Sequence, residues 1–136
     1  MQPLSSVLES RELPFSRVRS TLGAEGFSLG GDWSYSRGSF DRPLGEAHKV
    51  WLRLPFEVTS GMLDAESDES DATIRFGTPF ALRHEYNEGL ADDAQPRTYG
   101  ALIDQFQEPV DPDAPLEAAD LDRAKRMLRR AEELLS

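Results

Sequence analysis

The stretch from Gly26 to Asp41, GFSLGGDWSYSRGSFD, contains the spacing in this chain that most resembles a catalytic motif. Residues 26–30, GFSLG, match G-x-S-x-G, in which a strand-to-helix turn exposes a nucleophilic serine in the α/β-hydrolases. Here a helical pattern precedes Gly26 and a strand pattern follows it, so the order of elements is reversed. We therefore interpret the glycines as serving backbone geometry, and Ser28 is not expected to be a nucleophile.

The same glycines do not form a phosphate-binding loop of the P-loop kind. No G-K-[ST] follows Gly30 and Gly31, and Asp32 would repel an anion. Glycines at these positions permit a bulge or a positive φ, and Gly38 suits a turn after Ser36-Arg37. The stretch is thus predicted to be two strand pieces with a sharp change of direction between them.

Two segments resemble metal sites, and neither has the required spacing. Residues 84–88, HEYNE, begin like H-E-x-x-H but carry glutamate at the last position and lie in a strand pattern. The acidic loop 64–71, counted as an EF-hand, has Glu69 where glycine is needed and Arg75 where glutamate is needed. The chain has 2 histidines and no cysteine, so thiol chemistry and cysteine-ligated metals are excluded. We expect no metal, no cofactor and no catalytic residue.

Aromatic and charged side chains supply the candidate binding residues. Amphipathic aromatics are common at interfaces, but Trp33, Tyr35 and Trp51 can equally pack beneath a helix. His84 shares its parity with Leu82, which favours a hydrogen-bonded histidine at the margin of the core over a ligand-binding one. The full set of candidate binding residues is Trp33, Tyr35, Trp51, Arg53, His84 and Tyr86.

Length and composition indicate one domain and exclude several partners. The 136 residues, 38% of them hydrophobic, suit a single core, and we expect one domain over residues 1–136. A formal charge of -10 argues against nucleic acid and against an anionic membrane surface. No apolar run approaches the roughly twenty residues that span a bilayer, and the beginning of the sequence lacks signal-peptide features. The protein is expected to be soluble and cytoplasmic.

Hydrophobic periodicity predicts the elements that position these residues. Apolar residues alternate strictly over 50–58, which predicts a strand whose even residues face a core and whose odd residues, including Trp51 and Arg53, face outward. Residues 72–86 repeat the pattern with bends at Gly77 and Pro79, placing Phe80 and Leu82 with the core residues and Arg75 and Arg83 outward. The polar connection between the two predicts antiparallel pairing.

Helical spacing marks two further segments, at 14–25 and over the last twenty residues or so. Leu121, Ala124, Leu128, Ala131 and Leu135 form an apolar stripe, with Arg123, Arg126 and Arg130 covering the other side of that helix. Residues 4–13 suit an edge strand, and residues 99–106 suit a strand or a single helical turn. The predicted fold is α+β: an antiparallel sheet of four to five strands, a short N-terminal helix and a long C-terminal helix, in the order β-α-β-β-β(-β)-α.

Four segments carry a resemblance to a known family: GFSLGGDWSYSRGSFD, WLRLPFEV, RFGTPFALRHEYNEGL and FQEPVD. Through them the chain resembles the YugN-like family of uncharacterised proteins from Bacillus and its relatives. The resemblance spans most of the chain and implies no catalytic residues, because none is agreed for the family. The acidic segment at 64–71 is longer than the corresponding family turn.

Two functional hypotheses follow. The first is a non-enzymatic interaction module, a homodimer that uses the outward sheet face around Trp51 and Arg53, which the short helix 14–25 covers incompletely. The alternative is a small-ligand-binding protein or enzyme with a pocket between the sheet and the C-terminal helix, where His84, Tyr86 and a carboxylate supply acid–base chemistry. A polar cavity bordered by His84 would favour the second.

Overall fold

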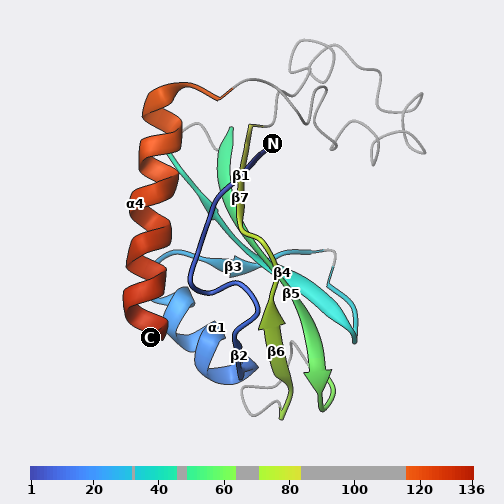
Figure 1. Ribbon diagram of the computed structural model, residues 1–136. Helices are drawn as coiled ribbons and strands as arrows, with labels where there is room; N and C mark the ends of the chain where they lie inside the picture. Colours follow the sequence, from blue (N-terminus) through green and yellow to red (C-terminus); the bar gives the residue numbers. More distant parts are fainter. Residues whose placement is uncertain (32, 46–48, 64–70, 84–115) are drawn as a thin grey trace, which may run out of the picture.

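A single antiparallel sheet and two helices make up the computed structural model, which describes residues 1–31, 33–45, 49–63, 71–83 and 116–136 (Figure 1). The elements are β1 Gln2–Pro3, β2 Glu12–Pro14, α1 Phe15–Gly23, β3 Ser28–Leu29, β4 Arg37–Pro43, β5 Val50–Ser60, β6 Thr73–Phe76, β7 Phe80–Arg83 and α4 Ala118–Leu135. This arrangement confirms the predicted α+β class. Neither described helix is long and apolar enough to cross a membrane.

The long strand β5 organises the sheet. β4 pairs along one side of it, while β7 and then β6 pair along the other side, β7 with residues 50–53 and β6 with residues 56–60. β3 lies beyond β4, β1 beyond β7 and β2 beyond β6. The sheet has seven described strands, and because β6 and β7 share one side of β5 they occupy five positions across it; the prediction was four to five strands.

The alternation of β5 is realised as predicted. Val50, Leu52, Leu54 and Phe56 are buried on the inner face, whereas Trp51 and the odd residues after it are half-buried or exposed on the outer face. The backbone oxygen of Pro55 accepts a hydrogen bond of 2.9 Å from Gly77 N, at the interruption between β6 and β7. The proline nitrogen, which cannot donate, therefore lies where the ladder is already broken, as expected for proline in a sheet.

The interruption at residues 77–79 also reverses the parity of the following strand. Phe80 pairs with Arg53 and Leu82 with Trp51, so both lie on the outer face, and the prediction that they join the core residues of β6 is wrong. Arg83 pairs with Val50 and is not on the outer face, contrary to expectation. Residues 77–79 are irregular, so the period of two is interrupted there. The alternation before Gly77 therefore does not predict which face of the sheet the residues after Pro79 occupy.

Both helices pack on the inner face of the sheet. The ring of Phe15 in α1 lies 5.7 Å from that of Phe40 and 6.0 Å from that of Phe56. The α4 stripe joins the same hydrophobic cluster, with Ala124, Leu128, Ala131 and Leu135 all buried. Figure 1 shows α4 upright along the sheet with α1 beside its lower end. The expectation that the first helix covers the outward face is therefore wrong. The apolar residues of α1, Phe15, Val18 and Leu22, are buried in the core on the inner face instead.

Two glycines have specific backbone roles. Gly26 has a φ of 92° and ends the turn after α1, while Gly30 and Gly31, where a positive φ was considered, do not have one. Gly38 lies so close to its neighbour on β5 that a Cβ there would be 2.8 Å from Phe56 Cζ. The predicted change of direction is the hairpin between β3 and β4, which pair antiparallel.

A buried carboxylate joins the beginning of the chain to α4. Glu132 is 8% exposed and accepts hydrogen bonds from Ser6 Oγ at 2.7 Å, from Val7 N at 3.2 Å and from Arg129 Nη1 at 2.9 Å. Burial acts to raise the pKa of Glu132, but the bonds from Ser6, Arg129 and Val7 outweigh it and hold the pKa below its ordinary value. The segment before β2 is thus held by the ionised form of this side chain.

We predict that Glu132→Gln lowers the free energy of unfolding by about 1 to 3 kcal/mol at pH 7, because it removes charge-assisted hydrogen bonds. A carboxylate whose pKa is lower in the folded state stabilises the fold above its unfolded pKa, and that stabilisation is lost as the pH falls through the folded value. Urea unfolding of both proteins should therefore converge towards pH 3. Glu133→Gln, an exposed neighbour, serves as control, and a gap between Glu132→Gln and its parent that persists unchanged at pH 3 would contradict the assignment.

Candidate functional site

The residues proposed from the sequence as a recognition surface do not converge on one site. Trp33 and Tyr35 lie in the β3–β4 connection, with ring centroids 6.2 Å apart in an edge-on contact. Trp33 packs against the inner cluster, and Tyr35 is 69% exposed. Trp51 and Arg53 lie on the opposite face of the sheet. His84, Tyr86, the 99–106 segment and most of the acidic loop lie outside the described residues.

On the outer sheet face, Arg53 is committed to an ion pair. Its Nε and Nη2 donate to the two carboxylate oxygens of Asp41 at 3.0 and 3.1 Å, and Asp41 is only 7% exposed. The guanidinium also lies 6.0 Å from the ring centroid of Phe80. These contacts give Arg53 a structural role in joining β4, β5 and β7. Its fork is therefore occupied within the chain.

A second row on the outer sheet face is exposed to solvent. Cross-strand pairing places Arg37, Glu57, Arg75 and Glu12 side by side on β4, β5, β6 and β2. Arg75 Nη2 donates to Glu57 Oε1 at 2.6 Å, and this bond is the main reason why the pKa of Arg75 is raised. The charges alternate in sign along the row. We call these four residues the charged row.

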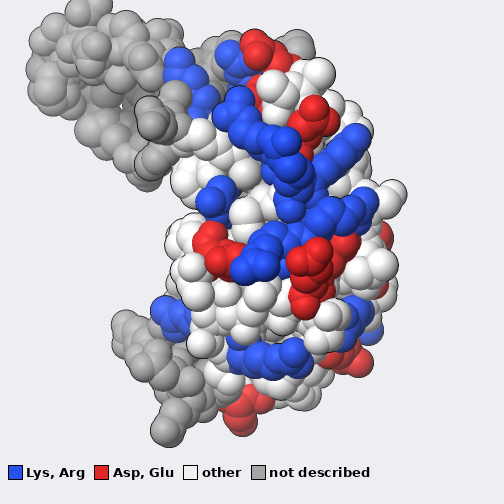
Figure 2. Space-filling model, turned by 90° about the vertical axis from the view of Figure 1, so that its left-hand side faces the viewer, with Lys and Arg blue, Asp and Glu red and all other residues white. Residues whose placement is uncertain are grey.

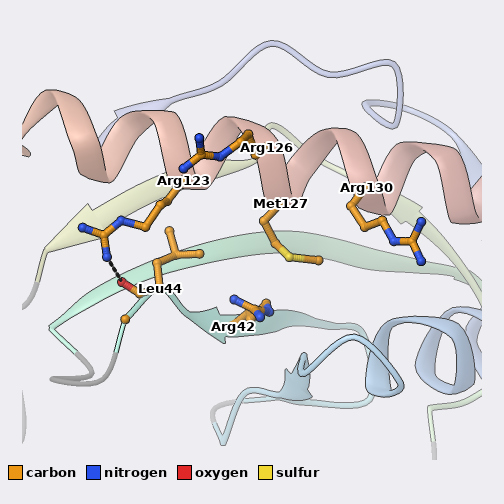
Figure 3. A pocket seen from close by; sticks show the side chains of 7 residues that line it. Arg42, Leu44, Arg123, Arg126, Met127 and Arg130 are labelled. Atoms are coloured by element: carbon orange, nitrogen blue, oxygen red, sulfur yellow. Dashed lines mark hydrogen bonds between the residues drawn. The ribbon is translucent and has the colours of Figure 1, made fainter.

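A different set of residues surrounds a hollow between α4 and the end of β4. Its volume is about 290 Å³, and we call it the arginine cleft; it is lined by Arg42, Leu44, Gly45, Arg123, Arg126, Met127 and Arg130. Figure 2 shows Lys and Arg side chains gathered in a band on the face of the molecule that carries α4. In Figure 3, Met127 points from α4 towards Arg42, and Arg123 and Arg130 lie at opposite ends. Four of the seven lining residues are therefore cations.

The fold positions these arginines in two ways. On α4, burial of Ala124, Leu128 and Ala131 leaves positions 123, 126 and 130 together on one flank of the helix. On the sheet, pairing of Arg42 with Leu52 fixes β4, and a hydrogen bond of 2.8 Å from Leu44 N to Val50 O holds the end of that strand. The cleft lies where this helix flank faces that strand end.

Backbone carbonyls orient the guanidinium of Arg42. Its Nε donates to Glu25 O at 2.8 Å and its Nη1 donates to Pro43 O at 3.0 Å. A carbonyl group carries no net charge, so these bonds fix the side chain while leaving its positive charge uncompensated. A preorganised cation of this kind loses little side-chain entropy when it binds an anion.

The three arginines of α4 differ in their partners. Arg123 Nη1 donates to Leu44 O at 3.4 Å and Arg130 Nε donates to Glu25 Oε1 at 2.6 Å. The bond to Glu25 is the main reason why the pKa of Arg130 is raised. Arg126 is exposed, and no residue in the described part of the chain accepts a hydrogen bond from it. Its five donors are available to a ligand.

Positive charge in the cleft exceeds the nearby negative charge. The four lining arginines face two described carboxylates bonded to them, Glu25 on Arg130 and Asp120 on Arg123, the latter at 3.4 Å. The helix dipole does not account for these arginines, because none of them lies in the last turn of α4. The arginines therefore outnumber the carboxylates bonded to them by two, and in a chain of negative net charge this local excess favours binding of an anion.

Sequence reasoning missed this site because it assigned Arg123, Arg126 and Arg130 to a solvated helix surface. The available signal was local: residues 123–130 carry five of the chain's 15 Lys and Arg and no acidic residue. The contribution of Arg42, some eighty positions earlier, depends on tertiary structure. The sequence alone contains no pattern that predicts the position of Arg42 beside α4.

The chemistry of the cleft is that of binding. The lining residues include no histidine, carboxylate, lysine, tyrosine or cysteine, which are the side chains that usually act as a general acid or base. Within the described ranges, no three His, Asp or Glu side chains are grouped as a metal site. The arrangement can hold an anion through guanidinium forks beside an apolar floor of Leu44 and Met127.

The fold and cleft define an α+β protein with a basic hollow between its C-terminal helix and its sheet. Residues 3–135 match the model of the YugN-like family, and the chain belongs to that family. It is 29% identical, over 99% of its length and 98% of the relative's, to the uncharacterised protein YugN of Bacillus subtilis (strain 168). The crystal structure of the uncharacterised conserved protein YugN from Geobacillus kaustophilus HTA426 has a similar fold, with a TM-score of 0.54 at 22% identity, covering 98% of this chain and 99% of that one.

The two ion pairs of the outer sheet face should differ in their effect on stability. We predict that Asp41→Asn lowers the free energy of unfolding by about 1 to 3 kcal/mol, because it leaves a half-buried guanidinium short of its acceptor. Glu57→Gln, in a pair whose side chains are 45% and 58% exposed, should cost clearly less than Asp41→Asn, because solvent screens an exposed pair. Urea unfolding at pH 7 measures both, and an equal loss from the two variants would contradict a structural role for Asp41.

Proposed function

We propose that the protein is a non-enzymatic binding protein whose ligand is a small anion held in the arginine cleft. The observation that carries this proposal is the state of two guanidinium groups. Arg42 is oriented only by neutral carbonyls among its described contacts, and Arg126 has no acceptor among the described residues. Oriented guanidinium groups without a countercharge are the arrangement that recognises phosphate and carboxylate groups.

The dimensions of the cleft support a small ligand. Its volume of about 290 Å³ is at the lower limit of ordinary ligand pockets. The cleft lies between the sheet and the C-terminal helix, and arginines supply its chemistry. The pocket of the ligand-binding hypothesis was expected near His84, which is outside the described residues. The formal charge of -10 disfavours long anionic polymers, because the rest of the surface repels them.

Pyrophosphate should bind the parent protein measurably in titration calorimetry at constant ionic strength. We predict that Arg42→Gln and Arg126→Gln each weaken this binding at least tenfold, since each removes a charge-assisted hydrogen bond. Arg37→Gln removes the same charge from the far end of β4, on the outer sheet face, and should change the affinity less than twofold. An equal effect of Arg37→Gln would indicate general charge attraction, and no binding to the parent would reject the proposal.

We also propose a homodimer through the outer sheet face, because the charged row is self-complementary. A two-fold axis parallel to the strands and between β5 and β6 reverses the order of the row. Arg37 then faces the partner's Glu12, and Glu57 faces the partner's Arg75. Each of the four exposed side chains then faces a side chain of opposite charge in the partner, which supports this face as an isologous contact.

Light scattering coupled to size exclusion tests the dimer over a range of protein concentrations. We predict that Arg75→Glu weakens association at least tenfold, because it sets like charges against each other. The double variant Glu57→Arg with Arg75→Glu restores opposite signs between positions 57 and 75, within the chain and across the axis. Although it leaves like charges beside Arg37 and beside Glu12 within each chain, it should recover most of the lost association. A parent that is monomeric at high concentration, or a double variant as weak as the single one, would contradict this interface.

A further inference from the structure

Resting on the proposed anion site, we propose that the ligand of the arginine cleft is a short linear chain of phosphoryl groups. The chemistry fits inorganic tripolyphosphate or the triphosphate of a nucleotide, which share that chain. The proposal rests on the spacing of the arginines, on the direction in which each is held, and on the carboxylates at the two ends of the cleft.

The arginines of α4 form a line longer than a single anionic group. Arg123 and Arg130 are seven residues apart, which corresponds to about 10 Å along a helix. Hydrogen bonds hold the two guanidinium groups towards opposite ends, Arg123 at Leu44 O and Arg130 at the Glu25 carboxylate (Figure 3). A single phosphate or carboxylate cannot contact both while these bonds persist. A chain of linked phosphoryl groups can.

Both walls of the cleft supply guanidinium groups. Arg126 comes from α4, where its side chain runs along the helix towards Arg123, and Arg42 comes from β4, with Met127 between the helix and the strand (Figure 3). A planar carboxylate is satisfied by one guanidinium fork in one plane. Tetrahedral phosphoryl oxygens point in several directions, so one chain can accept hydrogen bonds from the helix and from the strand at the same time. Phosphoryl groups therefore fit two facing walls better than carboxylates do.

Carboxylates limit the length of the chain. Glu25 lies against Arg130 at one end, and Asp120 lies 3.4 Å from Arg123 at the other. An anionic polymer that continued past either end would meet a like charge, which is destabilising. The cleft thus favours an oligomer of a few phosphoryl groups over long polyphosphate.

Titration calorimetry of the full-length protein at constant ionic strength, without divalent cations, tests the assignment. The probes are phosphate, pyrophosphate, tripolyphosphate, adenosine triphosphate and citrate, the last being a tricarboxylate of comparable charge. We expect tripolyphosphate to bind at least tenfold more tightly than phosphate and than citrate. Adenosine triphosphate tighter than tripolyphosphate would identify a nucleotide as the source, and equal or weaker binding would identify the inorganic chain; either supports the shared chemistry.

Two variants and one control distinguish binding by the line of arginines from general charge attraction. Arg130→Gln removes one end of the line and should weaken tripolyphosphate at least tenfold while changing phosphate less than threefold. Glu25→Gln removes the carboxylate at that end and should strengthen tripolyphosphate, whereas Arg37→Gln should change neither ligand by more than twofold. Circular dichroism and the melting temperature verify that each variant is folded.

The failures are distinguishable from one another. Phosphate and tripolyphosphate of equal affinity would overturn the linear chain and leave the anion site standing. Citrate as tight as tripolyphosphate would overturn the phosphoryl assignment. No binding of any probe at millimolar concentration would overturn both this inference and the proposed function.

Discussion

The packing of the α4 stripe on the inner face of the sheet is the constraint on which the rest of the structure depends. Ala124, Leu128, Ala131 and Leu135 are buried in the hydrophobic cluster that also contains the inner residues of β5. Because successive helical residues are about 100° apart, burial of this stripe also sets the direction of every other side chain of α4. Arg123, Arg126 and Arg130 are thereby directed to one flank, where β4 presents Arg42. Apolar packing thus determines where the charges meet.

Regular periodicity explains which parts of the fold were predictable. Strict alternation over β5 and the stripe of α4 extend far enough to define both the element and its buried face. The parity of Phe80 and Leu82 was not predictable, because three irregular residues separate β7 from β6. The side of the sheet chosen by α1 was not predictable either: its stripe of Phe15, Val18 and Leu22 identifies a buried face but not the partner that buries it.

The candidate site shows a different limit of sequence reasoning. Trp51 and Arg53 were correctly placed on the outward face of a strand, but the sequence did not reveal that Asp41 already engages Arg53. Conversely, the basic run at 123–130 was visible in the sequence. Its assignment to a candidate site depended on Arg42, which the carbonyls of Glu25 and Pro43 orient. The local sequence shows which types of side chain an element carries. Whether a charge is already paired depends on contacts between distant segments.

The bonds of Glu132 have a consequence for how the chain acquires its structure during synthesis. Ser6 bonds to a residue 126 positions later, and the cluster that buries Leu4 and Leu8 also contains the α4 stripe. Residues 4–8 are synthesised long before α4, so their buried groups are satisfied only after that helix has been made. Contacts of such large sequence separation slow folding, and the nascent sheet keeps its inner face exposed until α4 has been made. Protection of that surface by a chaperone would matter most in this interval.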